Sequence, residues 1–398
     1  MKRALALLAV LALLAITAPA QARDSIVIGG TVPLTGPFAP EADVFGKLMD
    51  TWAAMVNEKG GFNVKSEGKK LPLKIIYYDD KSDPPTAAKF YERLITVDKV
   101  DILIGPYSSP ISFPTSAVAE KHGVPIVLTA ANSSGLYKRN FKWMVSQDAP
   151  GPLWSERYFD MLKATGKAKT IAFVTEDTPH PKDVTDGCRQ YAQKAGLEIV
   201  LDQAVPKAAT DFTPVITQIK AKNPDIVYIA AFPPLAIAFM KQAKELDLNP
   251  REFHAIHHGG ALRKALGKDA EFVTGENFWL PGMKFGPYQM FEEALRRANF
   301  SVLDYPWTVH VVNGLVAIQQ AVESADSLKS ADLRAALGRV RFESLTGTMF
   351  FHETGYGTNQ PFPTQIIEGK YQLIWPDDPH YPAKPKHVYP TPPWSQRK

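Results

Sequence analysis

The fold is decided by a short stretch near residue 100, which reads Asp101-Ile102-Leu103-Ile104-Gly105-Pro106-Tyr107-Ser108-Ser109. Its first four residues form a mainly apolar run that indicates a buried strand, and the Gly-Pro pair that follows ends this run. We expect a helix over 114–121 and a second buried strand over 125–129. The stretch is therefore one unit of a parallel α/β sheet, in which a buried strand leads through a loop into a helix.

The same alternation of strand and helix continues on both sides of this unit. Before it, apolar periodicity predicts strands over 25–29 and 73–78 and helices over 43–57 and 84–97. After it, the rhythm restarts with strands over 170–175, 198–201, 225–230 and 253–256 and helices over 183–195, 211–221 and 235–246. Two such arrays of comparable size predict an α/β protein with two parallel-sheet lobes.

Ligands of parallel α/β sheets bind outside the carboxyl ends of the strands. We therefore expect any site to be built from the loops that follow the predicted strands. These loops cover residues 31–41, 79–85, 105–112, 130–135, 176–181, 232–234 and 257–260.

The composition is that of a globular protein without a nucleic-acid signature. The 398 residues include 22% charged and 11% aromatic residues, and the length suggests two domains. The formal charge of +4 includes Lys2 and Arg3, and losing these two positive charges would leave +2. A nearly balanced chain with no basic run gives little reason to expect nucleic acid as a partner. Cys188 is the one cysteine, so no internal disulfide is possible, and we expect it to be a small buried side chain.

The two ends of the chain differ from the rest in composition. A basic start and an apolar run over 4–16 lead to Ala20-Gln21-Ala22, the spacing of a signal-peptidase site. We expect cleavage after Ala22 and export of a soluble protein, because thirteen apolar residues are too few to cross a bilayer and no cysteine stands at the cleavage site to carry a lipid anchor. From residue 376 onward the chain is rich in proline, and we expect an extended tail without a core of its own.

Two of the loops are candidates for holding a negatively charged group. The first loop ends in Tyr107, Ser108 and Ser109 directly before a helix, where free backbone N–H groups and hydroxyls can bind an anion. The second loop includes Ala131, Asn132 and Ser133 after the next strand. Together they have the groups needed to hold a carboxylate, although ordinary helix capping explains the same residues equally well.

No enzyme or metal motif is present in the sequence. The nucleophile elbow, the phosphate loop and the H-E-x-x-H zinc motif are all missing, so we expect no catalytic residue and no cofactor. His254, His257 and His258 have spacing that suggests zinc, but no second ligand cluster accompanies them and we expect no metal. One of the two adjacent histidines is a candidate for lining a pocket. We interpret Asp79 and Asp80, at the end of a predicted strand, as turn or capping residues rather than as a catalytic pair.

An ordered set of short motifs gives the chain a resemblance to a known family. The motifs are Val32-Pro33-Leu34-Thr35-Gly36-Pro37, Asn57-Glu58-Lys59-Gly60-Gly61, Tyr78-Asp79-Asp80, Ile104-Gly105 with Ser108-Ser109, and Gly123-Val124-Pro125-Ile126. In this order and spacing they resemble the type I periplasmic solute-binding proteins of ABC importers, in the branched-chain amino-acid (Leu/Ile/Val-binding) family. The likeness extends over nearly all of the chain to about Trp375.

The resemblance implies two Rossmann-like lobes joined by three crossing segments, expected near 146–150, 277–282 and 359–364. Residues 1–22 are then a signal peptide, 23–147 with 280–360 lobe one, 148–279 with 361–375 lobe two, and 376–398 a proline-rich tail. The implied function is to capture a small carboxylate-bearing molecule in the cleft between the lobes for an ABC importer. The implied partners are that ligand and the permease subunits, the implied location is the periplasm, and we expect a monomer. A ligand-sensing receptor of the same fold, not coupled to transport, is the alternative.

The resemblance assigns matching site residues on lobe one, but on lobe two this chain departs from the family pattern. Ser109 matches the serine that holds the ligand carboxylate, and Ala131 and Ser133 match the groups beside it. On the second lobe, Phe232 stands in place of a family tyrosine and His180 in place of another aromatic residue. Tyr107 and Tyr305 are further candidates for aromatic walls of the site.

One departure from the family pattern bears on the ligand. His257 or His258 falls where amino-acid binders have a glutamate that pairs the ligand's ammonium group. A buried ammonium without a carboxylate partner costs several kcal/mol. We therefore expect an organic acid, including aromatic acids, to bind better than free leucine, isoleucine or valine. Glu176 and Asp177 are candidates for replacing the missing charge, which would restore amino-acid binding.

Overall fold

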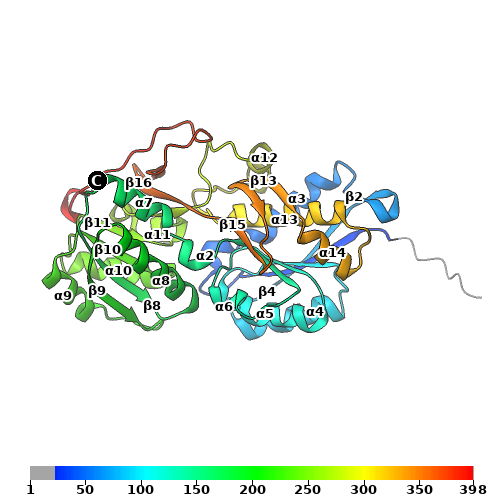
Figure 1. The fold of residues 1–398 in the computed structure, drawn as a ribbon, viewed down its shortest axis with the longest axis horizontal. Helices are drawn as coiled ribbons and strands as arrows, with labels where there is room; N and C mark the ends of the chain where they lie inside the picture. The colour runs from blue at the N-terminus through cyan, green and yellow to red at the C-terminus, as the bar shows by residue number, and fades with distance from the viewer. Residues whose placement is uncertain (1–22, 398) are drawn as a thin grey trace, which may run out of the picture.

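The computed structural model describes residues 23–397, and these residues form two lobes side by side (Figure 1). Each lobe has its own sheet with helices packed around it, as the alternation of strands and helices predicts. The predicted signal peptide, residues 1–22, lies outside the described residues. Among the described residues, no helix has the length and apolar character needed to cross a membrane.

The sheet of lobe one has six strands, all parallel. In spatial order they are β15 (Tyr356–Asn359), β7 (Met144–Asp148), β6 (Ile126–Leu128), β5 (Ile102–Ile104), β1 (Ile26–Val32) and β4 (Leu73–Asp79). The helices of this lobe are α2 (Ala39–Ala42), α3 (Phe45–Asn57), α4 (Pro84–Thr96), α5 (Ser109–His122), α6 (Ser134–Tyr137), α12 (Tyr288–Ala298), α13 (Thr308–Ser324) and α14 (Ser330–Leu337).

The sheet of lobe two has seven strands and is mixed. In spatial order they are β17 (Lys370–Leu373), β16 (Phe362–Ile367), β12 (Thr274–Asn277), β11 (Glu252–Ala255), β10 (Ile226–Ala230), β8 (Thr170–Glu176) and β9 (Glu198–Val205). The pairings that involve β16 are antiparallel and the others are parallel. The helices are α7 (Glu156–Thr165), α8 (Pro179–Lys194), α9 (Thr213–Lys222), α10 (Pro233–Glu245) and α11 (Gly260–Leu266).

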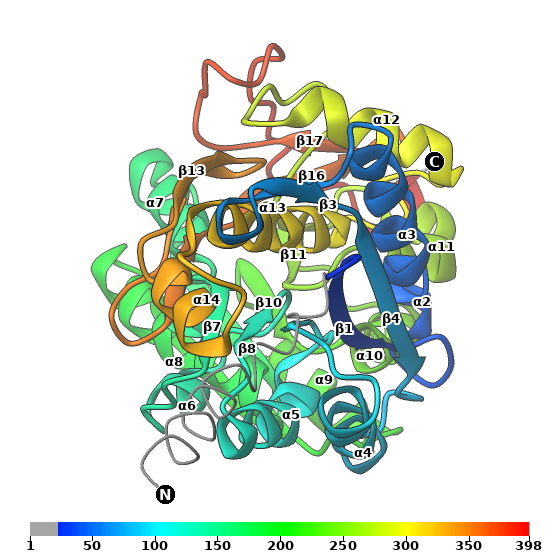
Figure 2. The same ribbon diagram turned by 90° about the vertical axis from the view of Figure 1, so that its right-hand side faces the viewer.

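Lobe one also contains two small antiparallel pairs of strands. They are β2 (Phe62–Val64) with β3 (Lys69–Leu71), and β13 (Arg341–Ser344) with β14 (Gly347–Phe350). Figure 2 shows the long helix α13 lying across this lobe between these hairpins and the strands of the main sheet.

The chain passes three times between the two sheets. It leaves the first sheet after β7 and enters the second at β8, and it leaves the second after β12. It returns to the first sheet at β15 and passes into the second again at β16, only two residues later. We propose that the lobe boundaries lie in these passages, as the resemblance implies.

Helix α5 begins earlier in the structure than the sequence predicts. The sequence predicts this helix over 114–121, but α5 begins at Ser109 and contains Pro114. Ser108 caps the helix with a φ of 84°, a conformation that costs free energy for any residue other than glycine. The earlier start places the hydroxyls of Ser108 and Ser109 at the helix N-terminus. A smaller difference concerns α4, which ends at Thr96, one residue before the predicted end.

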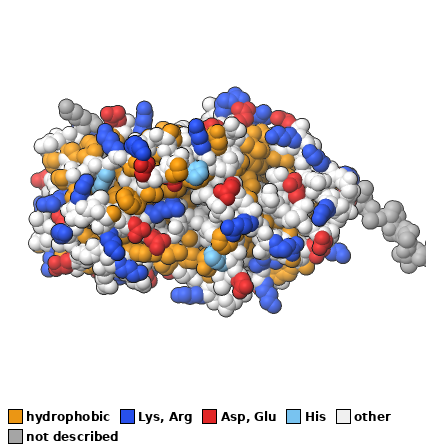
Figure 3. Space-filling view, turned by 45° about the horizontal axis from the view of Figure 1, so that its top comes forward, with side chains coloured by type: hydrophobic (Ala, Val, Ile, Leu, Met, Phe, Trp, Pro, Cys, Tyr) orange, Lys and Arg blue, Asp and Glu red, His pale blue; other side chains and the backbone are white. Residues whose placement is uncertain are grey.

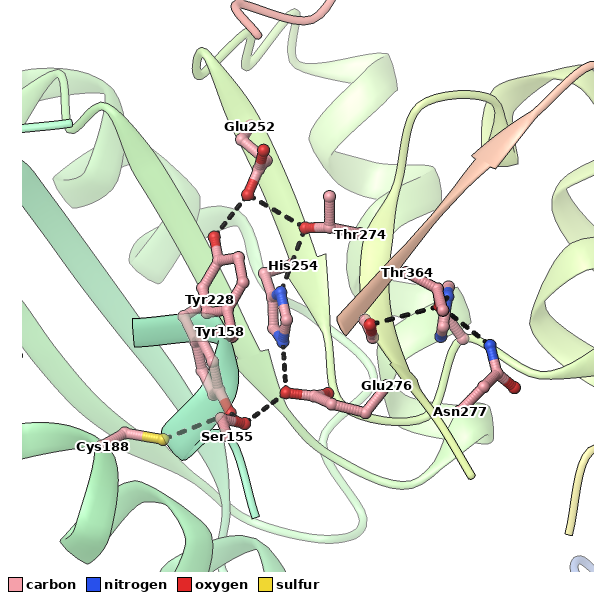
Figure 4. A network of polar contacts seen from close by, with 12 residues as sticks. Ser155, Tyr158, Cys188, Tyr228, Glu252, His254, Thr274, Glu276, Asn277 and Thr364 are labelled. Atoms are coloured by element: carbon pink, nitrogen blue, oxygen red, sulfur yellow. Dashed lines mark hydrogen bonds and ion pairs between the residues drawn. The ribbon is translucent and has the colours of Figure 1, made fainter. Parts of the chain in front are cut away.

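Lobe two contains a buried polar network next to its sheet (Figure 4). Glu276 on β12 accepts hydrogen bonds from Ser155 and from His254, with 3.0 Å between His254 Nε2 and Glu276 Oε1. Cys188 is fully buried, as expected, and its sulfur lies 3.2 Å from the Tyr228 hydroxyl. Burial raises the pKa of the Cys188 thiol, which keeps it protonated.

Candidate functional site

Loops at the carboxyl ends of strands from both lobes meet at one enclosed cavity. From lobe one, the loops after β5 and β6 run side by side, and Tyr107 pairs with Ala130 in an isolated parallel bridge. The cavity measures about 30 Å³, room for about two water molecules. A ligand of several carbon atoms can therefore enter only when the lobes or their side chains move apart. The residues that line the cavity are Tyr107, Ser108, Ser109, Ala130, Asn132, Asp148, Trp154, His180, Phe232, His257, Trp307 and His310.

Five of the nine candidate site residues line this cavity. They are Tyr107, Ser109, His180, Phe232 and His257. The other four are not among the lining residues, and each has a different surrounding.

Ala131 and Ser133 are buried in the loop beside the cavity. The carbonyl oxygen of Ala131 accepts hydrogen bonds from Ser146 Oγ at 2.5 Å and from Tyr137 OH at 3.3 Å. The Ser133 hydroxyl donates to Asp183 Oδ2 at 2.5 Å. A carboxylate of lobe two thus takes the hydroxyl that the resemblance assigns to a ligand.

His258 and Tyr305 do not line the cavity. The His258 ring is directed into lobe two, where its Nε2 lies 2.9 Å from Thr364 Oγ1. Of the two adjacent histidines, His257 is the one that lines the cavity. Tyr305 is partly exposed and packs against Phe300 and the Lys264 ammonium group.

Lobe one presents hydrogen-bond donors to the cavity. Ser109 Oγ accepts from the backbone N–H groups of Asn132 and Ser133, both at 3.2 Å, which leaves its own proton free to donate. The buried Ser108 Oγ and Asn132 Nδ2 have no hydrogen-bond partner among the described residues. Buried polar groups in proteins are nearly always paired, so these atoms mark a place where a polar ligand group fits. The N-terminus of α5 adds a positive dipole end.

Lobe two presents two neutral histidines. Burial lowers the pKa of His257 to about 4, against a smaller opposing effect of its hydrogen bond to Ala231. Burial also lowers the pKa of His180 well below its ordinary value, and the nearby His257 adds to this effect. Both rings are therefore uncharged near neutral pH.

Aromatic rings surround the histidines. Phe232 stacks on His257 with ring centroids 5.0 Å apart, and Trp307 meets the same ring edge-on at 5.4 Å. Trp154 lies 4.9 Å from the His180 ring and 5.9 Å from that of His257. The cavity is therefore walled by flat apolar surfaces that suit a planar ligand.

One carboxylate lines the cavity within the described residues, and it belongs to lobe one. Asp148 is the last residue of β7, and its Oδ1 lies 3.1 Å from His310 Nδ1, close enough for an ion pair when the ring is protonated. The two acidic residues that were candidates on lobe two have other partners. Glu176 accepts from the backbone N–H of Phe232 at 2.9 Å, and Asp177 pairs with Lys182 on the surface.

Sequence reasoning missed Trp154, Trp307, His310 and Asp148 as lining residues. Trp154 follows a short helical turn and Trp307 precedes the long helix α13, and both lie outside the loops that the carboxyl-end rule selects. Asn132 stood in a selected loop, and its neighbours were preferred because of the family pattern.

The lobes also contact each other outside the cavity. Glu41 on α2 is fully buried, and it accepts hydrogen bonds from Trp307 Nε1 of its own lobe and from the backbone N–H of Ala261 on α11 of lobe two. Arg263 on α11 pairs with Asp304 of lobe one at 2.5 Å. Gly260 on α11 lies so close to Asp304 that a Cβ atom would come within 2.0 Å of its carbonyl oxygen. These contacts and the Asp183 contact hold the cleft closed.

No group of three or more His, Cys, Asp or Glu side chains in residues 23–397 is arranged to hold a metal ion. On the face shown in Figure 3, acidic and basic side chains are interspersed, without a large patch of one sign. Two α/β lobes that close over a small polar and aromatic cavity define a receptor for a small solute.

Comparison with known proteins identifies the family. Residues 25–370 match the family model described as periplasmic binding protein. The chain is therefore a type I periplasmic solute-binding protein, in the Leu/Ile/Val-binding family of ABC importers.

One similar relative is the Leu/Ile/Val-binding protein BraC3 of Rhizobium johnstonii, 25% identical over 86% of this chain and 91% of its own length. A similar solved structure is the branched-chain amino acid transporter binding protein LivJ of Streptococcus pneumoniae with isoleucine. Its TM-score is 0.75 at 19% identity, over 87% of this chain and 97% of that one. A second is a solute-binding protein of an ABC transporter from R. palustris with 4-hydroxybenzoate, with a TM-score of 0.74 at 20% identity, over 87% of this chain and 95% of that one.

Proposed function

We propose that this protein captures a small organic acid, aromatic acids included, and delivers it to an ABC permease. The observation that carries the proposal is the lobe-two wall of the cavity, where His257 stands in an aromatic box. The resemblance assigns the glutamate of amino-acid binders to the position of His257 or His258. A neutral ring there supplies no countercharge for an ammonium group. The donors of lobe one at Ser108, Ser109 and Asn132 remain available for a carboxylate.

The relatives support both an acid and an amino acid as ligands of this fold. The similar LivJ structure contains isoleucine, and the similar R. palustris structure contains 4-hydroxybenzoate. The aromatic walls formed by Phe232, Trp154 and Trp307 favour the second kind of ligand for this chain.

A second candidate function is the binding of an amino acid, and Asp148 favours it. Its carboxylate lines the cavity on the same lobe as Ser109, and its Oδ1 forms no hydrogen bond among the described residues, with His310 Nδ1 3.1 Å away. In that case Asp148 pairs with the ligand's ammonium group in place of the missing glutamate.

We further propose that the protein is a monomer exported to the periplasm and cleaved after Ala22. Arg23, the first residue after the cleavage site, forms an ion pair with Asp101 at 2.5 Å, which supports an ordered mature N-terminus. The sensory alternative shares the same cavity, and it differs only in having a receptor rather than a permease as its partner.

The proposal is tested by a thermal-shift screen of benzoate, hydroxybenzoates, aliphatic acids, leucine, isoleucine and valine, with calorimetry on those that stabilise the protein. Mass spectrometry of ligand released by unfolding natively purified protein identifies any co-purified molecule. We expect an acid to raise Tm and the three amino acids to leave it unchanged. Stabilisation by leucine at micromolar concentration, with none from the acids, would overturn the proposal in favour of the Asp148 alternative.

A further inference from the structure

The surroundings of His257 determine which of its two ring nitrogens carries the proton. Its Nδ1 lies 3.0 Å from the carbonyl oxygen of Ala231. A carbonyl oxygen can only accept a hydrogen bond, so Nδ1 carries the proton. Because the ring is neutral, Nε2 has no proton and presents a lone pair. The backbone carbonyl fixes this tautomer, since it cannot rotate as a side-chain amide can.

His180 has a similar arrangement, but its partner is a side-chain amide rather than a backbone carbonyl. Its Nδ1 lies 2.7 Å from Asn132 Oδ1, and its buried Nε2 has no hydrogen-bond partner among the described residues. The two rings lie next to each other, with centroids 5.1 Å apart. With Nδ1 protonated, His180 Nε2 is a second lone-pair acceptor.

Each wall of the cavity presents polar atoms that have no hydrogen-bond partner among the described residues. Lobe one presents the free protons of Ser108, Ser109 and the Asn132 amide, beside the Asp148 carboxylate. Lobe two presents two acceptors, the Nε2 atoms of His180 and His257, beside one donor, Trp154 Nε1. A carboxylate satisfies the donors of lobe one, but it offers no proton to the acceptors of lobe two.

We propose that the ligand is a hydroxylated acid, most simply a phenolic acid, whose hydroxyl donates to the acceptor pair of His180 and His257. This inference rests on the proposed function and names its ligand class more narrowly. A hydroxyl suits the pair better than an ammonium group does, because the hydroxyl is neutral and needs no countercharge. A site built to bond a hydroxyl discriminates strongly against an analogue that lacks it, because the buried acceptors are then left unpaired.

The test compares calorimetric affinities for benzoate, the three monohydroxybenzoates and the three monomethoxybenzoates. The methoxy acids match the hydroxy acids in the position of the oxygen but have no proton to donate. We expect the best hydroxybenzoate to bind at least about tenfold more tightly than benzoate and than its methoxy analogue. Equal affinities for that hydroxy acid and benzoate would overturn the inference while leaving the proposed function standing. If no acid binds at all, the proposed function falls as well.

Two variants test whether the preference for a hydroxy acid over benzoate depends on His257. His257→Phe keeps a ring against Phe232 but removes the acceptor, and we expect the hydroxyl preference to fall toward one. His257→Gln can donate its amide N–H to Ala231 and present its oxygen to the ligand, so we expect it to retain the preference. Thermal melts of both variants verify folding. Persistence of the full preference in His257→Phe would overturn the role of this residue.

The tautomer has a test that needs no ligand. Nitrogen-15 NMR distinguishes protonated from unprotonated ring nitrogens, and His257→Gln identifies the signal of His257 by its loss. We expect an unprotonated Nε2 and a protonated Nδ1 at pH 7. The opposite tautomer would make Nε2 a donor and overturn the inference.

Discussion

At the scale of a single residue, Ser109 combines a structural contact with a free donor. Its oxygen accepts hydrogen bonds from two backbone N–H groups of the neighbouring loop, and this leaves its proton free to donate. We propose that this proton binds the ligand carboxylate, so that replacing Ser109 affects both the loop and ligand binding.

We predict that Ser109→Ala weakens ligand binding by roughly ten- to hundredfold, because a hydrogen bond to a charged group contributes about 1.5–3 kcal/mol. Some loss of stability accompanies it, since the N–H groups of Asn132 and Ser133 lose their acceptor. Calorimetry and thermal melts measure the two effects. Ser116→Ala, the same substitution two turns further along α5, is the control because Ser116 does not line the cavity. Equal affinities of the two variants would contradict a ligand role for Ser109.

Glu41 gives the closed protein a pH dependence. Burial raises its pKa to about 7, against smaller opposing effects of the hydrogen bonds from Trp307 and Ala261. In the unfolded chain the pKa is near 4.5. Between these values the folded protein holds a proton that the unfolded chain has released, so stability falls as pH rises. The loss reaches about 3 kcal/mol above pH 7, or less if the lobes open and expose Glu41 first.

We predict that Glu41→Gln removes this contribution, because glutamine does not titrate and its oxygen can still accept from Trp307. The free energy of unfolding of the variant, minus that of the wild type, should increase between pH 4.5 and pH 8. Denaturant unfolding at several pH values measures it. Other titrating groups, such as Asp80, whose pKa burial raises to about 6, are common to both proteins and cancel in the difference. A difference that stays constant with pH would contradict the prediction.

At the scale of elements, helix α8 connects lobe two to lobe one. Asp183 in its second turn accepts from Ser133 Oγ and, at 2.6 Å, from the backbone N–H of Ser134. The contact crosses the cleft, so it exists only while the cleft is closed. Closure of this kind is a hinge motion whose equilibrium depends on such differential contacts.

We predict that Asp183→Ala weakens ligand binding by about tenfold, because the closed form loses an acceptor that two donors share. Calorimetry measures the affinity, and small-angle X-ray scattering measures the contraction on ligand binding, which should be smaller. Asp186→Ala is the matched control, since Asp186 lies on the same helix and pairs with Arg189 of that helix. If both variants bind as the wild type does, Asp183 is not part of the closing mechanism.

Elements made of continuous apolar residues could be predicted from the sequence, and buried polar ones could not. Strands β5 and β10 are fully buried apolar runs, and both were expected within one or two residues. Strands β7 and β12 were missed because their buried residues include Gln147 and Glu276, which normally indicate exposure. Glu276 is tolerated because Ser155 and His254 donate to it (Figure 4).

The candidate site was predictable to the level of loops but not of side chains. The carboxyl-end rule selected the loops that contain Ser109, His180 and His257. Which of two adjacent histidines faces the cavity depends on the twist and end of β11, and the sequence does not encode it in any pattern. Trp154 enters the cavity from the segment after a passage between lobes, and its placement follows from how the two lobes meet.

At the scale of the whole molecule, the C-terminal tail binds lobe two as a strap. The strap, residues 376–397, lies beyond the residues that match the family model. Its carbonyl at His380 accepts from the backbone N–H of Lys284, and His387 Nε2 lies 2.6 Å from Glu252 Oε2. Near its end, Trp394 is buried against Phe253, with ring centroids 5.2 Å apart. The strap therefore spans from the segment after β12 to the far end of lobe two, as Figure 1 shows.

No residue of the strap lies in a strand, and the strap is attached by backbone hydrogen bonds from Lys386 to Leu373 and from Thr391 to Arg251 and by a few side chains. Trp394 is the largest of these, and its Nε1 donates to the carbonyl oxygen of Leu248 at 2.7 Å. We predict that Trp394→Ala lowers stability by about 3–5 kcal/mol, through loss of buried aromatic surface and of this hydrogen bond. Ligand affinity should stay within about twofold of the wild type, because the strap does not line the cavity. Calorimetric melts with and without ligand measure both quantities, and Gln396→Ala, an exposed neighbour, is the control. An unchanged Tm would mean that the strap is detached in solution. A large loss of ligand affinity with an unchanged free energy of unfolding would mean that the strap acts on the hinge rather than on lobe two.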